Sequence, residues 1–514
     1  MSDNRIISSA GQYGSTSNTG IQARRSVEVA GGHASVRRQE QAVRPVTTDH
    51  GVAGPADPGD VTSSNFRKKK RLAVFIVTLT LFLDLCLMTA LVPIAPAYLD
   101  ISANETGAYT KLGILFSSNA GVQLLTNIVL GPLIDKFGSS GPLFGGVLAM
   151  TLSTIAFAFA GDISWTHRYA IVLGARTLQG ISSACAATGG MAWLATLFPT
   201  DEERGEAMGT AMSGLGLGVL VGPPMGAAFT KFGVDAGWKY PFLILAFLCV
   251  VDAFLQMLLV WSPLPTYTAD DAESEKISPT RALKQLATDP YIIFTFTVSF
   301  FGNTVMAVLE ASFPQLLSST FGTSGWVLGA IFIPCMLPYV LIAPISGKYL
   351  ARFGRQWGLM FGGISLVIGM VTIPFVADAL KQHHLSVWIL SACLSFCGLG
   401  LGVMDSSVMT YMADVVQKRH SSLFGSSCAI VDGSVSLAFF MGPLVSNFLI
   451  DKLQFKWVYV GLGCLLLMFL PGVYFLHQLP NNQTGPESGD TEEREPLLSP
   501  DLNPGGLANA SIQD

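Results

Sequence analysis

Four carboxylic acids lie within long apolar stretches of the sequence: Asp84, Glu310, Asp405 and Asp432. Each costs roughly 2.5–3.5 kcal/mol to place at the middle of a bilayer, so their presence indicates a function and not a contribution to stability. A single basic residue, Arg176, is placed at a comparable depth. Carboxylates inside a membrane protein bind cations or protons, and these residues predict that chemistry.

The composition places these acids in a membrane protein. Of the 514 residues, 50% are hydrophobic and 13% are charged, and the mean hydropathy is +0.48. The chain is too apolar and too poor in charge for a soluble protein of this length. The net charge of −5 comes partly from acidic tails, so no nucleic-acid binding is expected.

Apolar stretches of about 20 residues, each long enough to cross roughly 30 Å of hydrocarbon, occur about twelve times. They lie near 72–98, 112–134, 141–161, 168–198, 206–230, 240–262, 290–317, 326–350, 357–378, 386–413, 423–450 and 456–478. The sequence therefore predicts an all-α protein with twelve transmembrane helices in two groups of six.

Polar segments flank and divide the two groups of helices. A tail, a central linker and a second tail are rich in polar residues, Gly and Pro, and both tails are predicted to be disordered. The sequence RALKQLA in the linker predicts a short helix along the membrane. The predicted organisation is a tail at 1–66, a half at 67–263, a linker at 264–289, a half at 290–479 and a tail at 480–514.

Basic residues predict which loops face the cytosol. A basic run at 67–71 precedes the first span, Lys136 follows the second, and Lys418 and Arg419 separate the tenth from the eleventh. Short loops rich in Lys and Arg remain cytosolic, so the linker and both termini are predicted to be cytosolic. Basic residues in the opposite loops, such as Lys381, weaken this contrast.

One loop sequence occurs in both groups of helices. The first copy, GPLIDKFG, contains Gly131, Asp135, Lys136 and Gly138, and the second, GKYLARFG, follows the eighth span. A tight basic turn would explain either copy alone. The repeat at matching places instead indicates duplicated halves related by an axis along the membrane normal.

The fifth span contains glycines at spacings of four, followed by two prolines: Gly218, Gly222, Pro223 and Pro224. Glycines four residues apart allow a second helix to approach closely, and prolines remove backbone donors and permit bending. Helix packing without a transport role is the alternative interpretation.

Several segments together resemble one known family. GPLIDKFG is similar to the loop signature of the major facilitator superfamily, and the Gly-Pro segment to its antiporter motif. LFLDLCLMTALVPIAP, GARTLQGISSA, VLEASFP, GVMDSSVM and AIVDGSVS resemble, in order, segments of the vesicular monoamine and acetylcholine transporters. The chain is identified as a divergent member of the vesicular amine transporter family. This implies the major facilitator fold, and we also expect a monomer.

The resemblance implies roles for individual residues. Asp84 and Glu310 match the acids that receive the substrate amine. Matching binding and gate positions are Asn303, Phe116, Phe332, Tyr339 and Phe439. Matching positions of the proton-coupling network are Asp405, Asp432, Arg176, Asn119, Gln123 and Gln179.

The chemistry of carboxylates leads to the same function. An ionised carboxylate attracts a protonated amine, and aromatic faces add roughly 0.5–2 kcal/mol of cation–π attraction. Protons from an acidic lumen neutralise the carboxylates and release the amine. The predicted function is a proton-coupled antiporter that moves a monoamine-like cation from the cytosol into acidic secretory or synaptic vesicles, driven by the proton gradient without a metal or other cofactor.

Several departures from the family, among them Leu316 in place of a seventh-helix gate tryptophan, distinguish this chain. The family has a lysine where this chain has Asn119, so Asp432 is expected to face an asparagine, and to be protonated through much of the cycle or to pair with Arg176. Leu85 and Phe439 replace a polar residue and a tyrosine, so a substrate other than catecholamines or acetylcholine is expected. Asp252, near the end of the sixth span, is predicted to be interfacial.

Two further motifs concern modification and sorting. Asn104 begins a glycosylation sequon in the first lumenal loop. Glu493, Leu497 and Leu498 form an acidic dileucine, which predicts binding of a clathrin adaptor and residence in vesicles.

Other function classes stay open or are disfavoured. A plasma-membrane drug/proton antiporter of the same fold is the main alternative. A receptor or an enzyme is disfavoured, because the chain has no HExxH or GxSxG pattern. The eight cysteines all fall inside predicted spans, so they indicate packing and not disulfides.

Overall fold

The computed structural model describes residues 58–92, 99, 108–163, 165–198, 200–229, 239–260, 279–321, 330–383, 388–420 and 423–477. Asn104, Glu493, Leu497 and Leu498 lie outside these ranges. The elements are α1 (Pro58–Ala90), α3 (Ala108–Phe137), α4 (Ser140–Ala160), α5 (Trp165–Ala184), the π-helix η1 (Cys185–Gly189), α6 (Gly190–Leu197), α7 (Asp201–Phe229), α8 (Lys239–Val260), α9 (Pro279–Thr288), α10 (Pro290–Phe321), α12 (Ile333–Phe353), α13 (Arg355–His383), α14 (Ile389–Arg419), α15 (Phe424–Phe469) and the 3₁₀-helix η3 (Leu470–His477).

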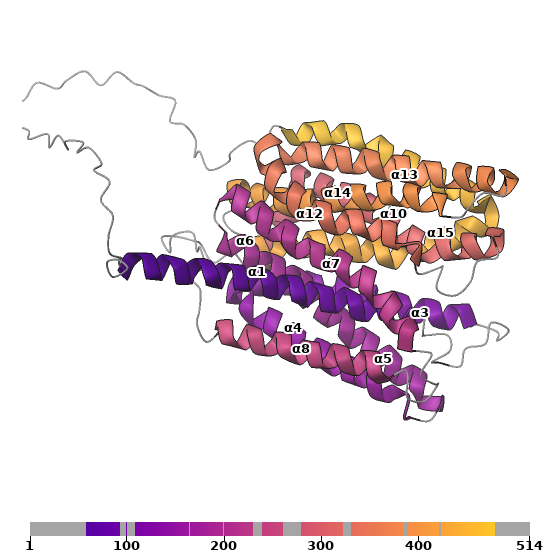
Figure 1. Ribbon diagram of the computed structural model, residues 1–514. Coiled ribbons are helices and arrows are strands. Elements are labelled where there is room, and N and C mark those ends of the chain that lie inside the picture. Colours follow the sequence, from indigo (N-terminus) through magenta and orange to yellow (C-terminus); the bar gives the residue numbers. More distant parts are fainter. Residues whose placement is uncertain are drawn as a thin grey trace, which may run out of the picture. The chain divides into compact units, whose positions relative to one another are not determined.

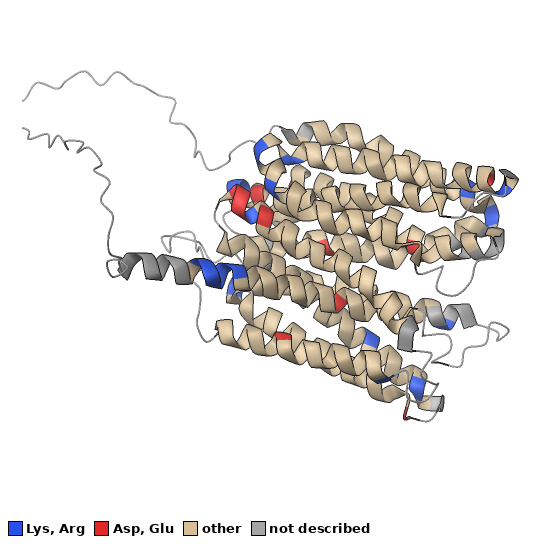
Figure 2. Ribbon diagram, in the orientation of Figure 1, with Lys and Arg blue, Asp and Glu red and all other residues tan. Residues whose placement is uncertain are grey.

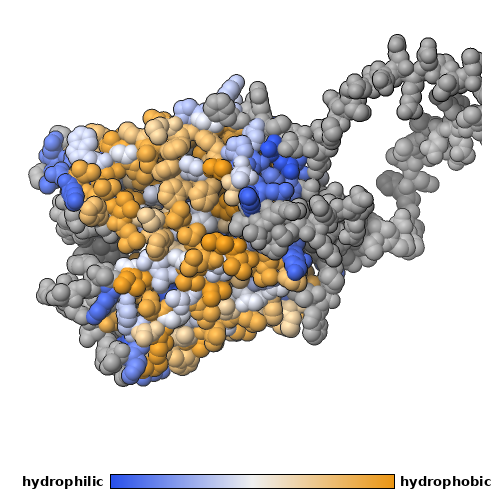
Figure 3. Space-filling view, turned by 180° about the vertical axis from the view of Figure 1, so that it is seen from behind, coloured by the Kyte–Doolittle hydropathy of each residue, from blue (hydrophilic) through white to orange (hydrophobic). Residues whose placement is uncertain are grey.

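Within the described ranges the helices make twelve passes along the bundle. Ten are long and apolar enough to cross a membrane. The other two passes are more polar. One is α7, whose first turn is acidic, and the other is the continuous run of α5, η1 and α6, which contains Arg176. Figure 3 shows a broad hydrophobic flank between two more hydrophilic ends. The prediction of an all-α, multi-pass membrane protein is confirmed.

The helices of the two halves lie on opposite sides of the bundle (Figure 1). Those from α1 to α8 form one side, and those from α10 to η3 form the other. Between them in sequence lies α9, which contains RALKQLA, so the predicted short helix is confirmed. Leu286 of α9 is fully buried in the core that the halves share.

The first helix begins earlier than the sequence predicted. α1 starts at Pro58, inside the tail assigned to residues 1–66. Residues 58–71 are polar and basic, so their hydropathy does not distinguish them from a tail. Proline is favoured in the first turn of a helix, because backbone N–H groups there have no acceptor within the helix and the absence of one costs no hydrogen bond.

The eleventh and twelfth passes share one helix assignment, α15. An unbroken helix of its 46 residues would be roughly 69 Å long, more than twice the hydrocarbon thickness. The chain breaks at Gln454, whose φ of 65° and ψ of 157° are not helical. This break separates the two passes.

Asp289, between α9 and α10, connects the linker to the end of α14. The Nε of Arg419 donates to its carboxylate at 2.8 Å, Nε2 of His420 lies 2.8 Å away, and the Tyr291 N–H donates at 2.9 Å. Burial alone would raise the pKa of Asp289, but these hydrogen bonds and the charge of Arg419 outweigh it and lower the pKa from 3.8 to about 2.

Replacing Asp289 by Asn is therefore expected to destabilise the protein by about 2 kcal/mol at neutral pH. The carboxylate stabilises the fold above its unfolded pKa, and this contribution is lost as the pH falls from about 4 toward 2. Thermal unfolding of both proteins in detergent should show a difference that is constant from pH 7 to 5 and shrinks below pH 4. A difference that is constant down to pH 3 would contradict this assignment.

Candidate transport site

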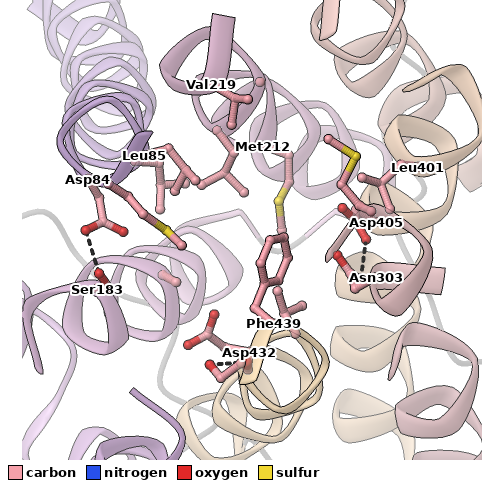
Figure 4. Close-up of a pocket in the computed structure, with 18 of the residues that line it drawn as sticks. Asp84, Leu85, Ser183, Met212, Val219, Asn303, Leu401, Asp405, Asp432 and Phe439 are labelled. Carbon is pink, nitrogen blue, oxygen red and sulfur yellow. Dashed lines mark hydrogen bonds between the residues drawn. The ribbon is translucent and has the colours of Figure 1, made fainter. Parts of the chain in front are cut away.

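A cavity of about 140 Å³ lies between the two halves, and the four intramembrane acids all line it. They come from four helices, with Asp84 on α1, Glu310 on α10, Asp405 on α14 and Asp432 on α15. Figure 2 shows acidic residues within the helical core, away from the charged ends. In Figure 4 the carboxyl groups of Asp84, Asp405 and Asp432 approach a common space from different sides.

Asp84 is held by a serine that the sequence did not indicate. The hydroxyl of Ser183 on α5 donates to Asp84 Oδ1 at 2.6 Å (Figure 4), and the Asp84 side chain is 4% exposed. Arg176 is within electrostatic reach of Asp84. This arrangement leaves the other carboxylate oxygen of Asp84 for a ligand.

Asp405 has two of the predicted residues as neighbours. Asn303 Nδ2 donates to Asp405 Oδ1 at 3.0 Å, and the Tyr339 hydroxyl donates to Oδ2 at a longer 3.4 Å. The three side chains come from α14, α10 and α12, and all line the cavity. The structure therefore assembles into one cluster two residues predicted to bind substrate, Asn303 and Tyr339, and one predicted to couple protons, Asp405.

Glu310 differs from the other three acids. Among the described residues, no side chain or backbone group donates a hydrogen bond to it. A carboxylate in an apolar wall needs donors or a cation to offset its desolvation. Glu310 thus leaves both carboxyl oxygens available to a ligand or a proton.

Asp432 is bound by two amides and not by the partner expected. Gln123 Nε2 donates to its carboxylate at 3.0 Å and Asn127 Nδ2 at 2.7 Å. The Thr188 hydroxyl donates to Asn127 Oδ1 at 2.9 Å, and Thr188 lies in the π-helix η1. Such π-helical turns occur frequently at functional sites.

Asp432 makes no ion pair with Arg176 among the described residues, so the expectation of that pair is wrong in this conformation. Asn119 and Asp432 both line the cavity, and no hydrogen bond joins their side chains. Asn119, Gln123 and Asn127 follow one another at intervals of four on α3, so they share one face of the helix. The amide that contacts Asp432 most closely is one turn beyond Gln123. This spacing was the signal that could have identified Asn127.

The side chain of Asn119 has no hydrogen-bond partner among the described residues. Its side chain is 1% exposed and lines the cavity, and both Nδ2 and Oδ1 are unpartnered. Unpaired polar atoms in a buried site are costly. Asn119 therefore offers a donor and an acceptor to whatever occupies the cavity.

Four predicted residues do not line the cavity: Arg176, Gln179, Phe116 and Phe332. Arg176 donates to Gln179 Oε1 at 2.7 Å and to the Met88 carbonyl at 3.1 Å, and its guanidinium lies 5.5 Å from the Phe116 ring centroid. Phe332 packs edge-to-face on Phe313. Their participation in transport stays a prediction.

The rest of the cavity wall is apolar and rich in methionine. Phe439 lines it together with six methionines: Met88, Met191, Met212, Met306, Met336 and Met409. Methionine side chains are flexible and polarisable, and they make favourable contacts with aromatic rings. Among the described residues of the wall there is no Lys, Arg or His. The site thus combines acids with an adaptable apolar surface.

The two halves are joined at one end of the bundle, called here the clasp end, which contains residues 135–138, 201–206, 347–355, 414–420 and 423–426. Asp135 at the end of α3 accepts hydrogen bonds from the N–H groups of Gly425 at 2.6 Å and Ser426 at 2.9 Å. These N–H groups begin α15, where the helix dipole favours an anion. A Cβ on Gly131 would lie 2.8 Å from Ser426 Cα.

Lys136, the base of the same motif, does not take part in the clasp. It is exposed, and its Nζ lies 5.0 Å from the ring centroid of Phe137. Gly138 has a φ of 84°, and Gly354, at the same position of the second copy, has a φ of 99°. Both copies end a helix with a glycine in a conformation that other residues rarely adopt. The repeated motif is thus matched by a repeated geometry.

A second part of the clasp joins α7 to α12 and α14. Arg352 pairs with Glu202 at 2.7 Å, Lys348 pairs with Glu206 at 2.8 Å, and Arg204 pairs with Asp414. Arg204 is fully buried, and its Nη1 also donates to Gln417 at 2.7 Å. Neither Arg204 nor Asp414 was predicted from the sequence as a site residue, although an arginine within the acidic run DEERGE was a usable signal.

The glycines of α7 allow close contact with α1. A Cβ on Gly218 would lie 2.7 Å from the Phe82 carbonyl oxygen, and one on Gly222 would lie 2.0 Å from Thr89 Oγ1. Pro223 and Pro224 both lie inside α7. The Gly-Pro segment thus packs α7 against the helix that carries Asp84.

Asp252 lies well inside the apolar span Lys239–Leu259 and not at its end, so the prediction that it is interfacial was wrong. Its side chain in α8 is 0% exposed, and its Oδ2 forms a hydrogen bond of 2.7 Å with the Thr80 hydroxyl. Position along a helix predicts depth in the membrane, but the direction in which a side chain faces depends on packing.

The fold and the loop motif that is repeated in both halves define a transporter of the major facilitator superfamily. The family model of this superfamily matches residues 74–427 and 312–507. Two solved structures share the fold. The human organic anion transporter MFSD10 has a TM-score of 0.63 at 18% identity, over 80% of this chain and 99% of that one. The proton:xylose symporter XylE has a TM-score of 0.64 at 14% identity, over 81% and 96%.

Sequence relatives place the chain more narrowly. It is 31% identical to the human synaptic vesicular amine transporter over 80% of this chain and 89% of that protein. It is 34% identical to a probable vesicular acetylcholine transporter of Danio rerio over 80% of each. It is also 34% identical to the human chromaffin granule amine transporter, of which it covers 66%. The chain belongs to the vesicular amine transporter family, which confirms the prediction of a transporter and not an enzyme.

Proposed function

We propose that this protein is a proton-coupled antiporter that carries a cationic amine from the cytosol into acidic vesicles. The observation that supports this most is the cavity wall, which contains four acids and, within its described part, no basic side chain. Such a site favours a cation. The relatives' names, which refer to amines or acetylcholine, support the same substrate class.

The proposed mechanism assigns the four acids to two tasks. Glu310, which has no donor, and Asp84, which has one, receive the ammonium group. Asp405 and Asp432 are held by amides and exchange protons. When lumenal protons neutralise the acids, the amine loses its counter-charge and leaves, and the cavity reopens to the cytosol with its protons.

The proposed orientation places the clasp end in the cytosol. Lys348, Arg352 and Arg355 lie at this end, and the basic run at 67–71 precedes the first span. Basic loops favour the cytosolic side. The conformation described is then closed toward the cytosol, and both termini are cytosolic.

Uptake by purified protein in liposomes tests this function. The lumen is acidified, and serotonin, dopamine, histamine, octopamine, acetylcholine and polyamines are offered outside, with and without the proton gradient. At least one cation should accumulate, and collapse of the gradient should release it. Failure of every cation to accumulate would contradict the proposal.

The substitution Asn119→Lys is expected to alter the dependence of uptake on lumenal pH. A lysine on the cavity wall would keep nearby acids ionised at lower pH, so the midpoint should move by about one unit toward acid. It should also weaken amine binding by repulsion. Uptake over a range of lumenal pH measures both, with Asn119→Leu as the uncharged control. A pH profile unchanged from that control would contradict the proposed shortage of positive charge.

A further inference from the structure

Asp252 is a buried acid that the transport cavity does not include. It lies in α8, and neither it nor its neighbours Thr80 and Gln256 line the cavity. Thr80 is on α1, one turn before Asp84, and Gln256 is one turn after Asp252 on α8. The three side chains, each no more than 3% exposed, meet where α1 packs against α8.

All the donors near Asp252 approach the same oxygen. Thr80 Oγ1 lies 2.7 Å from Asp252 Oδ2, and Gln256 Nε2 lies 3.2 Å from that oxygen. Within the described part of the chain, Asp252 Oδ1 has no hydrogen-bond partner, and neither does Gln256 Oε1. An ionised carboxylate shares its charge between both oxygens, so half of that charge would be buried without a donor. Burial strongly disfavours such a group.

A protonated Asp252 satisfies the same geometry better. The Thr80 hydroxyl also lies 2.9 Å from the carbonyl oxygen of Ile76, and a hydroxyl has one proton to donate. If Thr80 donates to Ile76, as threonines in helices commonly do, Asp252 can donate its own proton to Thr80. The unpartnered Oδ1 is then a neutral carbonyl oxygen, which costs less to bury than a charge.

The surrounding helices supply no positive charge to stabilise a carboxylate. α8 packs against α1, α4 and α7. α4 has no ionisable side chain, α1 presents Asp84 and Cys86 in this region, and the charged residues of α7 are confined to positions 201–206 at its first turns. Cys249 of α8 interacts electrostatically with both Asp252 and Asp84. No described Lys or Arg lies within ion-pair distance of Asp252.

We propose that Asp252, Thr80 and Gln256 form a proton-binding site inside the first half, separate from the transport cavity, and that it holds a proton in this conformation. Thr80 and Asp84 are one turn apart on α1, so a shift of this helix changes the donors of both acids. Proton binding at Asp252 and ligand binding at Asp84 are then linked, and the linkage is reciprocal.

Infrared spectroscopy of the full chain in lipid tests the proposal without any transport assay. The spectrum of the wild type minus that of Asp252→Asn, at neutral pH, should contain the carbonyl band of one protonated carboxylic acid. Asp378→Asn is the matched control. Asp378 is exposed and pairs with Lys456 at 2.9 Å, so its difference spectrum should contain the two bands of a carboxylate.

Three outcomes would overturn the proposal. Carboxylate bands in the Asp252→Asn difference would show that the group is ionised. Carboxylate bands that respond to added sodium would identify a sodium site instead. If Asp252→Asn does not fold, Thr80→Val retains the acid but removes its hydrogen-bond partner, and it should shift the acid band to higher frequency. Absence of that shift would also overturn the proposal.

Discussion

Replacement of Asp84 by Asn is expected to reduce amine uptake at least about 100-fold. Removing one partner of a buried ion pair typically costs 3–5 kcal/mol, because the other charge is left without compensation. In this chain the uncompensated charge would be the substrate ammonium. Uptake of a cation that the wild type accumulates, measured with the proton gradient maintained, tests this expectation.

Ser183→Ala is the matched control for Asp84. It removes the 2.6 Å hydrogen bond to Asp84 but leaves the carboxylate in place. Loss of one hydrogen bond to a charged group costs roughly 1.5–3 kcal/mol, so uptake should fall clearly less than in Asp84→Asn. Equal losses in both variants would indicate that Asp84 acts through the position of its helix and not through its charge.

Gly205→Ala is expected to abolish uptake by preventing closure of the clasp end. A Cβ at Gly205 would lie 2.0 Å from the carbonyl oxygen of Gly347, a contact between α7 and α12 that a backbone atom cannot avoid. The halves would have to separate there, so the conformation described would not form. Cysteines at Glu202 and Arg352, whose side chains pair at 2.7 Å, should be cross-linked by a short bifunctional thiol reagent without this substitution and not with it.

Gly145→Ala controls for the general effect of adding a methyl group to a helix. Outside the backbone of its own helix, no described atom lies within 4 Å of a Cβ added to Gly145, so this variant should retain uptake and the cross-link. Alanine favours a helix over glycine by about 1 kcal/mol, so a loss of helix propensity cannot explain a defect in Gly205→Ala. Normal uptake and normal cross-linking in Gly205→Ala would contradict the importance of this contact.

The sequence was sufficient to predict the helices and the location of the four acids. Long apolar stretches predict spans through their length, and an acid in the middle of a span must face a protein interior or a water-filled cavity. The placement of Asp84, Glu310, Asp405 and Asp432 around one cavity follows from these two arguments together with the two-half arrangement. The polar extension of α1 was missed, because hydropathy does not report polar helices.

The partners of the acids could not be predicted in the same way. Asp432 binds Gln123 and Asn127 because of the register between α15 and α3, which depends on the contact of Gly131 with Gly425 and Ser426. A single sequence contains no direct information about such registers. Asp252 was misjudged for a related reason, since its burial depends on how α8 packs against α1.

The coupling of amine entry to proton exit is tested most directly by measuring the lumenal pH. Liposomes that contain the protein and a trapped pH indicator, with no initial gradient, receive the transported amine outside. The lumen should become more alkaline than in liposomes that contain the Asp84→Asn variant. These control liposomes correct for passive entry of the neutral amine, which also raises the lumenal pH. Amine uptake with lumenal alkalinisation no greater than in the Asp84→Asn liposomes would contradict this coupling.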